Sequence, residues 1–281
     1  MEIKTVGVVG AGQMGGGIAQ VCAMAGLNVV LCDVNAAQLT RAREVMVSSL
    51  ARLQKKGIEL DSEAIVSRLS ASQDMAALAE VDVVVEAATE RLETKLEILR
   101  QISGIVRPDA IIASNTSSIS LTVLAAQVAH PERAIGMHFM NPVPVMQLVE
   151  IIRALQTSDE THAAIVALSE KLGKVPVTVK DAPGFVSNRV LMPMINEAIF
   201  CLHEGLATPE AIDTVMKLGM NHPIGPLALA DLIGLDTCLS IMDVLYHEFR
   251  DSKYRACPLL VQMVAAGRLG RKVSCGFYAY E

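Results

Sequence analysis

The stretch Gly10-Ala11-Gly12-Gln13-Met14-Gly15 decides the fold, because it follows a short apolar run, Thr5–Val9, and opens a helical pattern. Glycines at these positions let the chain turn sharply, let a pyrophosphate approach the backbone and let the helix pack closely on the strand. The helix N-terminus would add N–H donors and a partial positive charge for phosphate groups. The spacing alone is a weak signal, but its position between strand and helix predicts a dinucleotide-binding turn.

Asp33 ends the second apolar run, Asn28–Cys32, at the distance where an acid can bind the hydroxyls of an adenine ribose. The alternative is a solvated Asp that starts a turn. A carboxylate at this place repels the extra phosphate of NADP, and Val34-Asn35 offers no Arg to hold that phosphate. The sequence therefore predicts NAD as the cofactor.

Short apolar runs and longer helical patterns alternate through residues 1–182, which predicts an α/β fold with a Rossmann-type domain, a parallel sheet covered by helices. The expected strands are Thr5–Val9, Asn28–Cys32, Arg68–Ala71, Val81–Glu86, Ala110–Ser114, Ala134–His138, Leu148–Ile152 and Val175–Val179. The clearest helical patterns are Met14–Ala25, Ala36–Lys56, Glu90–Ile102 and Glu160–Leu172.

The pattern changes at Lys180-Asp181-Ala182-Pro183-Gly184, where proline and glycine interrupt it. The expected elements after this point are helices only: Val186–Glu204, Pro209–Leu218, Ala228–Phe249 and Pro258–Ala266. We therefore predict a dinucleotide-binding domain over residues 1–182 and a smaller, all-helical domain over residues 183–281. The apolar helices of the second domain suggest a role in substrate binding and in forming a homodimer.

Composition excludes several classes of protein. Of the 281 residues, 52% are hydrophobic, so a sizeable core is available, yet no apolar run is long enough to predict a membrane span. The net charge of −6 and the absence of Trp argue against nucleic acid as a partner. The six cysteines occur singly, so neither a metal site nor a redox dithiol is expected, and a reduced, cytoplasmic protein is the prediction.

His138 differs from the other histidines because it ends an apolar run and is followed by a turn. Glu150 interrupts another apolar run, Leu148–Ile152, where an ionised carboxylate is costly unless it is paired. His138 is a suitable partner, and such a pair could move a proton near neutral pH. A purely structural pair is the alternative. Two polar turns, residues 86–90 and 114–118, are expected either as helix caps or as ligand contacts.

Four motifs in one order resemble the L-3-hydroxyacyl-CoA dehydrogenase family, whose short bacterial members act on 3-hydroxybutyryl-CoA. They are Gly10-Ala11-Gly12-Gln13-Met14-Gly15, Ser114-Asn115-Thr116-Ser117-Ser118, His138-Phe139-Met140-Asn141-Pro142 and Pro183-Gly184-Phe185-Val186-Ser187-Asn188-Arg189. The resemblance extends to the closing Gly276-Phe277-Tyr278. The sequence departs from the family pattern at Met140, where a second Phe is more usual, and at Cys275, where the family has a polar residue.

The resemblance implies roles for individual residues. The implied catalytic residues are Ser117, His138, Glu150 and Asn188. The implied cofactor contacts are Gly10, Gly12, Gln13, Met14, Gly15, Asp33, Glu90, Lys95, Asn115, Ser117 and Asn141, and the implied substrate contacts are Ser49, Lys56, Ser117 and Asn188. The expected reaction transfers a hydride between NAD and a short-chain 3-hydroxyacyl-CoA.

A basic patch supports an anionic substrate independently of the resemblance. The helical pattern after the second strand carries Arg41, Arg43, Arg52, Lys55 and Lys56 in an otherwise acidic protein. Two other functions remain as alternatives. The first is a related dehydrogenase of a free hydroxy acid, such as L-gulonate or carnitine, and the second is a non-catalytic, crystallin-like NAD-binding protein.

Overall fold

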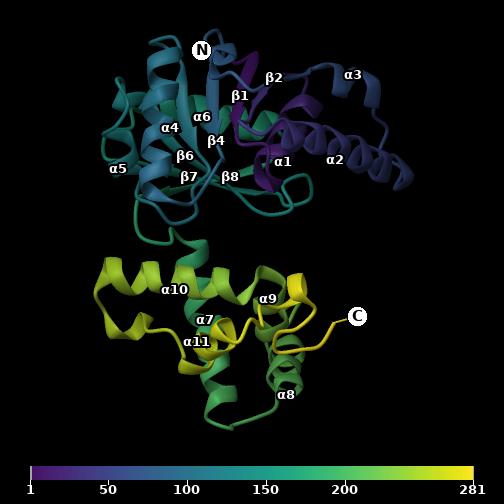
Figure 1. Ribbon diagram of the computed structural model, residues 1–281, viewed down its shortest axis with the longest axis vertical. Helices are drawn as coiled ribbons and strands as arrows, with labels where there is room; N and C mark the ends of the chain where they lie inside the picture. Colours follow the sequence, from purple (N-terminus) through teal and green to yellow (C-terminus); the bar gives the residue numbers. More distant parts are fainter. Residues whose placement is uncertain (1, 281) are drawn as a thin grey trace. The chain divides into compact units, whose positions relative to one another are not determined.

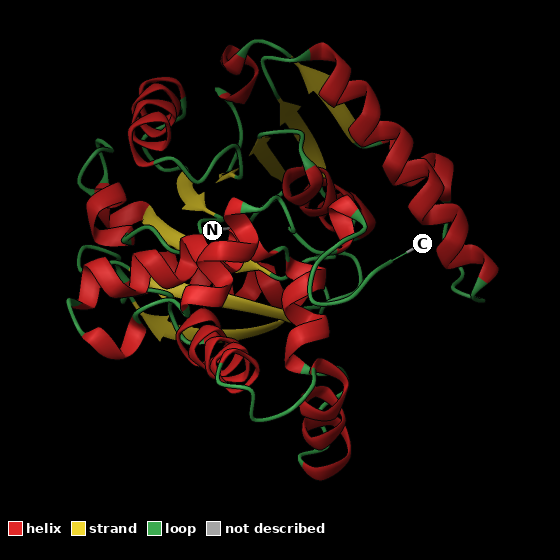
Figure 2. Cartoon of the chain, turned by 60° about the horizontal axis from the view of Figure 1, so that its bottom comes forward, coloured by secondary structure: helices red, strands yellow, loops and turns green. Residues whose placement is uncertain are grey.

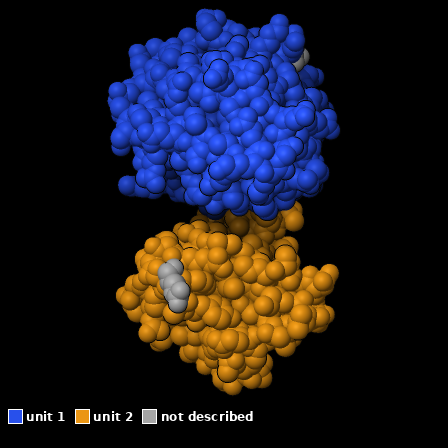
Figure 3. Space-filling view, turned by 90° about the vertical axis from the view of Figure 1, so that its right-hand side faces the viewer, with its two compact units in different colours: residues 1–182 blue, residues 183–281 orange. Residues whose placement is uncertain are grey.

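The computed structural model describes residues 2–280, and the chain divides into two compact units, residues 1–182 and 183–281, which Figure 3 draws in blue and orange. Each unit has its own hydrophobic core. No helix within residues 2–280 has the length and apolarity needed to cross a membrane. The same residues contain no group of three or more His, Cys, Asp or Glu side chains arranged to hold a metal ion.

The first unit contains one eight-stranded sheet with the order β3-β2-β1-β4-β5-β6-β7-β8 (Figures 1 and 2). Its strands are β1 (Thr5–Val9), β2 (Asn28–Cys32), β3 (Leu69–Ser72), β4 (Val83–Glu86), β5 (Ile111–Ser114), β6 (Ala134–Phe139), β7 (Leu148–Arg153) and β8 (Val175–Lys180). All eight expected strands are confirmed. The largest difference in a boundary is at β4, which begins at Val83 and not at Val81.

The strand order changes direction between β1 and β4, because the chain first runs outward to β3 and then crosses back to β4. Ligands of such sheets bind where the carboxyl ends of the strands diverge at this switch point. The expectation of a wholly parallel sheet is wrong at one place, since β6 and β7 pair antiparallel. That pairing follows from the short connection between them, because a parallel crossover needs about a dozen residues or more.

The helices of the first unit are α1 (Gln13–Met24), α2 (Ala36–Lys55), α3 (Ser62–Ser67), α4 (Leu92–Ile105), α5 (Leu121–Ala125) and α6 (Asp159–Lys171). The four expected helices are confirmed, although α4 begins at Leu92 and not at Glu90. The short helices α3 and α5 were not expected. Side-chain caps fix several of the helix starts: Asn35 accepts from the Ala37 amide and Ser158 from the Thr161 amide.

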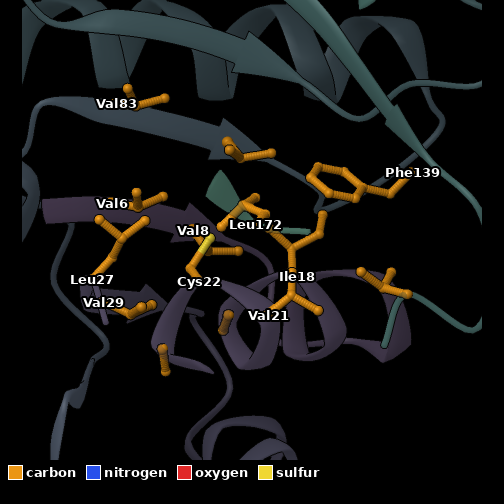
Figure 4. Packing of buried hydrophobic residues seen from close by; sticks show 14 of the residues in the cluster. Val6, Val8, Ile18, Val21, Cys22, Leu27, Val29, Val83, Phe139 and Leu172 are labelled. Carbon is orange, nitrogen blue, oxygen red and sulfur yellow. The ribbon is translucent and has the colours of Figure 1, made fainter. Parts of the chain in front are cut away.

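The core of the first unit joins one face of the sheet to α1, α2 and α6. Figure 4 shows Val6 and Val8 of β1 beside Ile18 and Cys22 of α1, all of them fully buried. Burying an aliphatic side chain of this kind stabilises a fold by about 1.5–3 kcal/mol. Burial also raises the pKa of the Cys22 thiol to about 12, so this cysteine acts as a small hydrophobic residue.

The regular elements of the second unit are helices within its described residues, and its closing segment adds isolated β-bridges of Cys275 with Gly270 and Ala279. The unit contains α7 (Ser187–His203), α8 (Pro209–Thr214), a π-helical turn (Val215–Gly219), α9 (Pro226–Ile233), α10 (Leu235–Phe249) and α11 (Pro258–Ala265). The expected single helix over Ala228–Phe249 is wrong. Gly234 separates α9 from α10 with a φ of 103°, a backbone conformation that side chains other than glycine rarely adopt. The expected Pro209–Leu218 helix likewise changes to π geometry at Val215.

Two buried carboxylates hold the final described segment against the second unit. Asp231, 1% exposed, accepts hydrogen bonds from the amides of Phe277 and Tyr278 (3.0 Å each) and from the hydroxyl of Tyr280 (2.9 Å). Asp213 accepts from the Tyr278 hydroxyl at 2.8 Å. A buried carboxylate is tolerated when donors surround it in this way, so the closing segment is part of the packing of this unit.

Candidate active site

The glycine-rich turn between β1 and α1 has the geometry that its sequence predicts. Gly10 has a φ of 99°, and a Cβ at Gly15 would overlap the carbonyl oxygen of Gly10. A Cβ at Gly12 would meet nothing within 4 Å, so the backbone there borders open space. No side chain caps the first turn of α1, so the N-terminus of this helix is suited to bind a phosphate group. The residues present therefore fit a dinucleotide.

Asp33 lies directly beside this turn. One of its carboxylate oxygens, Oδ2, accepts a hydrogen bond from the Ala11 amide at 2.7 Å, and Oδ1 accepts from the Asn35 amide at 2.8 Å. The carboxylate thus orders the glycine-rich turn. It also lines a cavity of about 690 Å³ together with Gly10 and Val34, a place that suits the adenine ribose.

A larger cavity, of about 1120 Å³, lies between α1, α2 and the loop 141–145. The charged residues among those that line it are Arg41, Arg52, Lys55 and Lys56, all of α2 or its C-cap, with no carboxylate. Ser49 also lines it, and its hydroxyl accepts a hydrogen bond from the buried Gln20 amide at 2.9 Å. A cavity with such a wall attracts an anionic ligand.

His138 and Glu150 stand directly opposite each other on the antiparallel strands β6 and β7. The Nδ1 atom of His138 lies 2.8 Å from Oε2 of Glu150, and the two residues are 8% and 2% exposed. An ionised carboxylate only accepts hydrogen bonds, so it selects the imidazole tautomer with its proton on Nδ1. The predicted pair is present in the structure, and the acid–base role predicted for it requires this tautomer.

Asn115 connects the turn after β5 to the end of β6. Its side-chain oxygen accepts a hydrogen bond from the Phe139 amide at 2.9 Å, directly after His138. Phe139 itself is buried in the same core cluster as Ile18 of α1 (Figure 4). Asn115 and Phe139 therefore fix the end of the strand that carries His138. Whether Asn115 also holds the cofactor stays a prediction.

Glu86 and Lys95 form an enclosed ion pair at the end of β4. Their side chains are 0% and 1% exposed, and the Lys95 ammonium lies 2.5 Å from Oε2 of Glu86. Ser114 donates to the same oxygen at 2.8 Å, and the Ala88 amide donates to Oε1 at 2.9 Å. The structure thus gives Lys95 a partner within the protein. Its predicted contact with the cofactor stays a prediction.

Glu90 gathers the turn that follows β5. Its Oε1 atom accepts from the amides of Ser117 and Ser118 at 2.8 and 3.0 Å, and it also lies within hydrogen-bond distance of the hydroxyls of Thr116, Ser117 and Ser118. The polar turns 86–90 and 114–118 are therefore tied to each other. This contact brings Glu90 and Ser117, two predicted site residues, together.

The other predicted residues lie in two places. Asn141 lines the larger cavity next to the glycine-rich turn. Asn188 is buried in α7 of the second unit. Its predicted role in catalysis and substrate binding stays a prediction. The contacts of three buried residues were not predicted from the sequence. These residues are Gln20, which donates to Ser49, Glu86, which pairs with Lys95, and Lys174, whose ammonium is buried.

Comparison with known families completes the assignment. Residues 5–182 match the profile described as the 3-hydroxyacyl-CoA dehydrogenase NAD-binding domain, and residues 184–280 match the C-terminal domain of the same family. The chain belongs to the 3-hydroxyacyl-CoA dehydrogenase family. It is an NAD-dependent dehydrogenase, and the resemblance drawn from the sequence motifs is confirmed.

Several members of the family are similar to the chain over nearly their whole length. The chain is 56% identical to a probable 3-hydroxybutyryl-CoA dehydrogenase of Bacillus subtilis, over 100% of the chain and 99% of that protein. It is 53% identical to the 3-hydroxybutyryl-CoA dehydrogenase of Bradyrhizobium diazoefficiens, over 99% and 96%. The crystal structure of (S)-3-hydroxybutyryl-CoA dehydrogenase from Ralstonia eutropha superposes with a TM-score of 0.97 at 58% identity, over 100% of both chains.

Proposed function

We propose that this chain interconverts a short (S)-3-hydroxyacyl-CoA, such as 3-hydroxybutyryl-CoA, and the corresponding 3-ketoacyl-CoA. The observation that carries the proposal is the buried His138–Glu150 pair in a sheet whose switch point holds a dinucleotide-binding turn. The substrate is supported by the names of the relatives and by the cations that line the larger cavity.

The chemistry asks for one proton transfer at the 3-oxygen. Since Glu150 engages Nδ1, the Nε2 atom of His138 is the one that removes the hydroxyl proton during oxidation and returns it during reduction. Glu150 holds the ring in the required tautomer and stabilises the imidazolium that forms. Bound NAD supplies the hydride acceptor. Ser117 is proposed to hydrogen-bond the reacting oxygen and not to act as a nucleophile.

Cofactor and substrate are proposed to use different walls of the site. The glycine-rich turn and Asp33 would hold the pyrophosphate and the adenine ribose of NAD. Ser49 and Lys56, with the neighbouring cations of α2, would hold the phosphates of coenzyme A. Gln13 and Asn141 lie at the edge between these two groups, since both line the larger cavity.

The experiment that tests the proposal is an NADH-oxidation assay with a panel of substrates. Acetoacetyl-CoA should be reduced with a higher kcat/KM than longer 3-ketoacyl-CoA substrates, and the reverse assay should show no turnover of L-gulonate or L-carnitine. Turnover of either free acid in preference to 3-hydroxybutyryl-CoA would overturn the substrate class. NADH binding without turnover of any of these compounds would favour a crystallin-like, non-catalytic role.

A homodimer through the helical unit and a cytoplasmic location are further proposals. The dimer is supported by apolar side chains that stay exposed in the second unit, among them Val190, Leu206 and Leu218, of which the last is 82% exposed. Light scattering on the eluting protein should give twice the chain mass of 30.0 kDa. A monomeric mass at the working concentration of the assay would contradict the dimer.

A further inference from the structure

Lys174 carries its charge into the interior of the first unit. The residue lies in the turn between α6 and β8 and is 9% exposed. Its ammonium donates to the carbonyl oxygens of Val143, at 2.5 Å, and Met146, at 2.8 Å. Within residues 2–280, no carboxylate lies in ion-pair distance of it. Burial lowers the pKa of this amine, so keeping the charge there has an energetic cost.

The two carbonyls belong to the loop 140–147, which joins the strand of His138 to the strand of Glu150. The same loop supplies Asn141, Pro142, Val143, Pro144 and Val145 to the wall of the larger cavity. Any displacement of the loop would therefore change the shape of that cavity and the connection between β6 and β7.

The loop has few contacts of its own that would hold it. Pro142 and Pro144 have no amide N–H to donate. The amides of Val145 and Met146 both donate to one acceptor, the carbonyl of Pro142. The carbonyls of Val143 and Met146 accept from Lys174, and the Val143 contact is buried, where a carbonyl without a donor is unfavourable.

The opposite side of the loop packs on the helix that follows the glycine-rich turn. A Cβ at Gly17 of α1 would come within 2.9 Å of the Val143 Cβ and within 3.6 Å of Pro144, so helix and loop are already in close contact. Val143 thus touches α1 through its side chain and Lys174 through its carbonyl. The loop is held by these two contacts and, at its end, by the Val175 amide, which donates to the Gln147 carbonyl at 2.8 Å.

We propose that Lys174 is a positioning residue that holds the loop 140–147 in the form that binds NAD and acyl-CoA. The inference rests on the proposed use of the larger cavity by these ligands. Replacing the ammonium by an apolar group removes both carbonyl contacts, so the free protein spends less time with the cavity in its binding form. The substrate and cofactor then bind more weakly, while His138 and Glu150 still pair across β6 and β7.

The test uses Lys174→Met in the full chain, with Lys171→Met as the matched control. Lys171 is an exposed lysine in the last turn of α6, three positions earlier, and its contact to the Ile3 carbonyl is long, at 3.5 Å. Lys174→Met should raise KM for acetoacetyl-CoA and for NADH by about tenfold and change kcat by less than about threefold. Lys171→Met should leave both constants unchanged.

Hydrogen exchange provides a readout that does not depend on turnover. The amides of Val145 and Met146 should exchange faster in Lys174→Met, while amides of β1 and β2 keep their protection. A folded Lys174→Met protein with unchanged KM values and unchanged exchange in the loop would overturn the proposal. Equal effects of Lys171→Met would do the same.

Two further variants keep the test decisive if Lys174→Met does not fold. Lys174→Arg retains both the charge and the donors, so it should bind nearly as the unaltered chain does. Lys174→Gln is shorter and uncharged, so it should raise both KM values and speed hydrogen exchange in the loop. A Lys174→Gln protein that matches the unaltered chain in KM and in loop exchange would overturn the proposal. A chain that turns over none of the CoA substrates would refute the proposed function. The loop would then be assessed from exchange and from the Kd for NADH alone.

Discussion

The two glutamates Glu86 and Glu150 both lie in strands of the sheet and both pair with a basic side chain, but their partners differ. Glu86 meets Lys95, and both side chains are fully enclosed. Glu150, 2% exposed, meets His138, 8% exposed, near the end of β6. A Lys–Glu pair is a fixed pair of charges, whereas a His–Glu pair can exchange a proton near neutral pH. The enclosed Glu86–Lys95 pair therefore suits a structural role, whereas the His138–Glu150 pair suits the proton transfer proposed above.

The largest effect is expected at the exchangeable pair. Positioned proton transfer contributes about 10²–10⁴ in rate, so His138→Gln should lower kcat by that factor. NADH binding, measured by fluorescence titration, should stay nearly unchanged because the glycine-rich turn and Asp33 are untouched. A fully active His138→Gln enzyme would remove this histidine from the mechanism.

Glu150→Gln tests whether the two residues act as a unit. The single variant should lower kcat and shift its pH dependence, since the imidazolium loses its partner. Adding it to His138→Gln should cost little more, because groups that act together are not additive. Losses that multiply in the double variant would mean that Glu150 works independently of His138.

The enclosed pair should respond in stability and not in rate. Removing one partner of a buried ion pair costs about 3–5 kcal/mol, so Lys95→Met should lower the midpoint of thermal unfolding by roughly 10 °C. Glu86→Gln combined with Lys95→Met should lose less, because no uncompensated charge remains. A stable Lys95→Met protein with a raised KM for NADH would instead support a direct contact of Lys95 with the cofactor.

A smaller effect is expected at Asp33, on the edge of the smaller cavity. Asp33→Ser removes the charge that repels the extra phosphate of NADP and an acceptor of the Ala11 amide. The ratio of kcat/KM for NADH to that for NADPH should therefore fall by about tenfold or more. Equal activity of the unaltered enzyme with both cofactors would show that Asp33 does not select NAD.

The smallest effect is expected at Lys56, which is exposed at the end of α2. Lys56→Ala should raise KM for acetoacetyl-CoA by a few-fold, roughly 0.2–1 kcal/mol, with little change in kcat. Acetoacetyl-pantetheine lacks the phosphates and should be unaffected. If both substrates lose affinity equally, Lys56 does not act on a phosphate of coenzyme A.

The sequence predicts those features that depend on local patterns. Short apolar runs and the turn residues between them predict all eight strands and the turn at Gly10–Gly15. Each of these features is specified within a few neighbouring residues. The pairing of His138 with Glu150 followed from the cost of a lone carboxylate in an apolar strand. The direction of β7 was missed, although the shortness of the segment 139–147 argues against a parallel crossover.

Features that depend on distant contacts could not be predicted in this way. Gly234 within an apolar helical pattern costs only about 1 kcal/mol, so the pattern gives no sign that a φ of 103° ends α9 there. Nothing in the sequence next to Lys95 or Lys174 distinguishes them from solvated lysines. Only the fold brings Glu86 to one of them and two loop carbonyls to the other.

The donors that surround Asp231 come from Phe277, Tyr278 and Tyr280, which leave the ribosome after every other element of the second unit. Until these residues have been synthesised, the Asp231 carboxylate lacks the donors that surround it in the folded unit, and it would favour water over the interior. The first unit needs nothing beyond residue 182 for its sheet. During synthesis the Rossmann-type unit can thus reach its final packing early, whereas the helical unit completes its packing around Asp231 only after residues 277–280 have been synthesised.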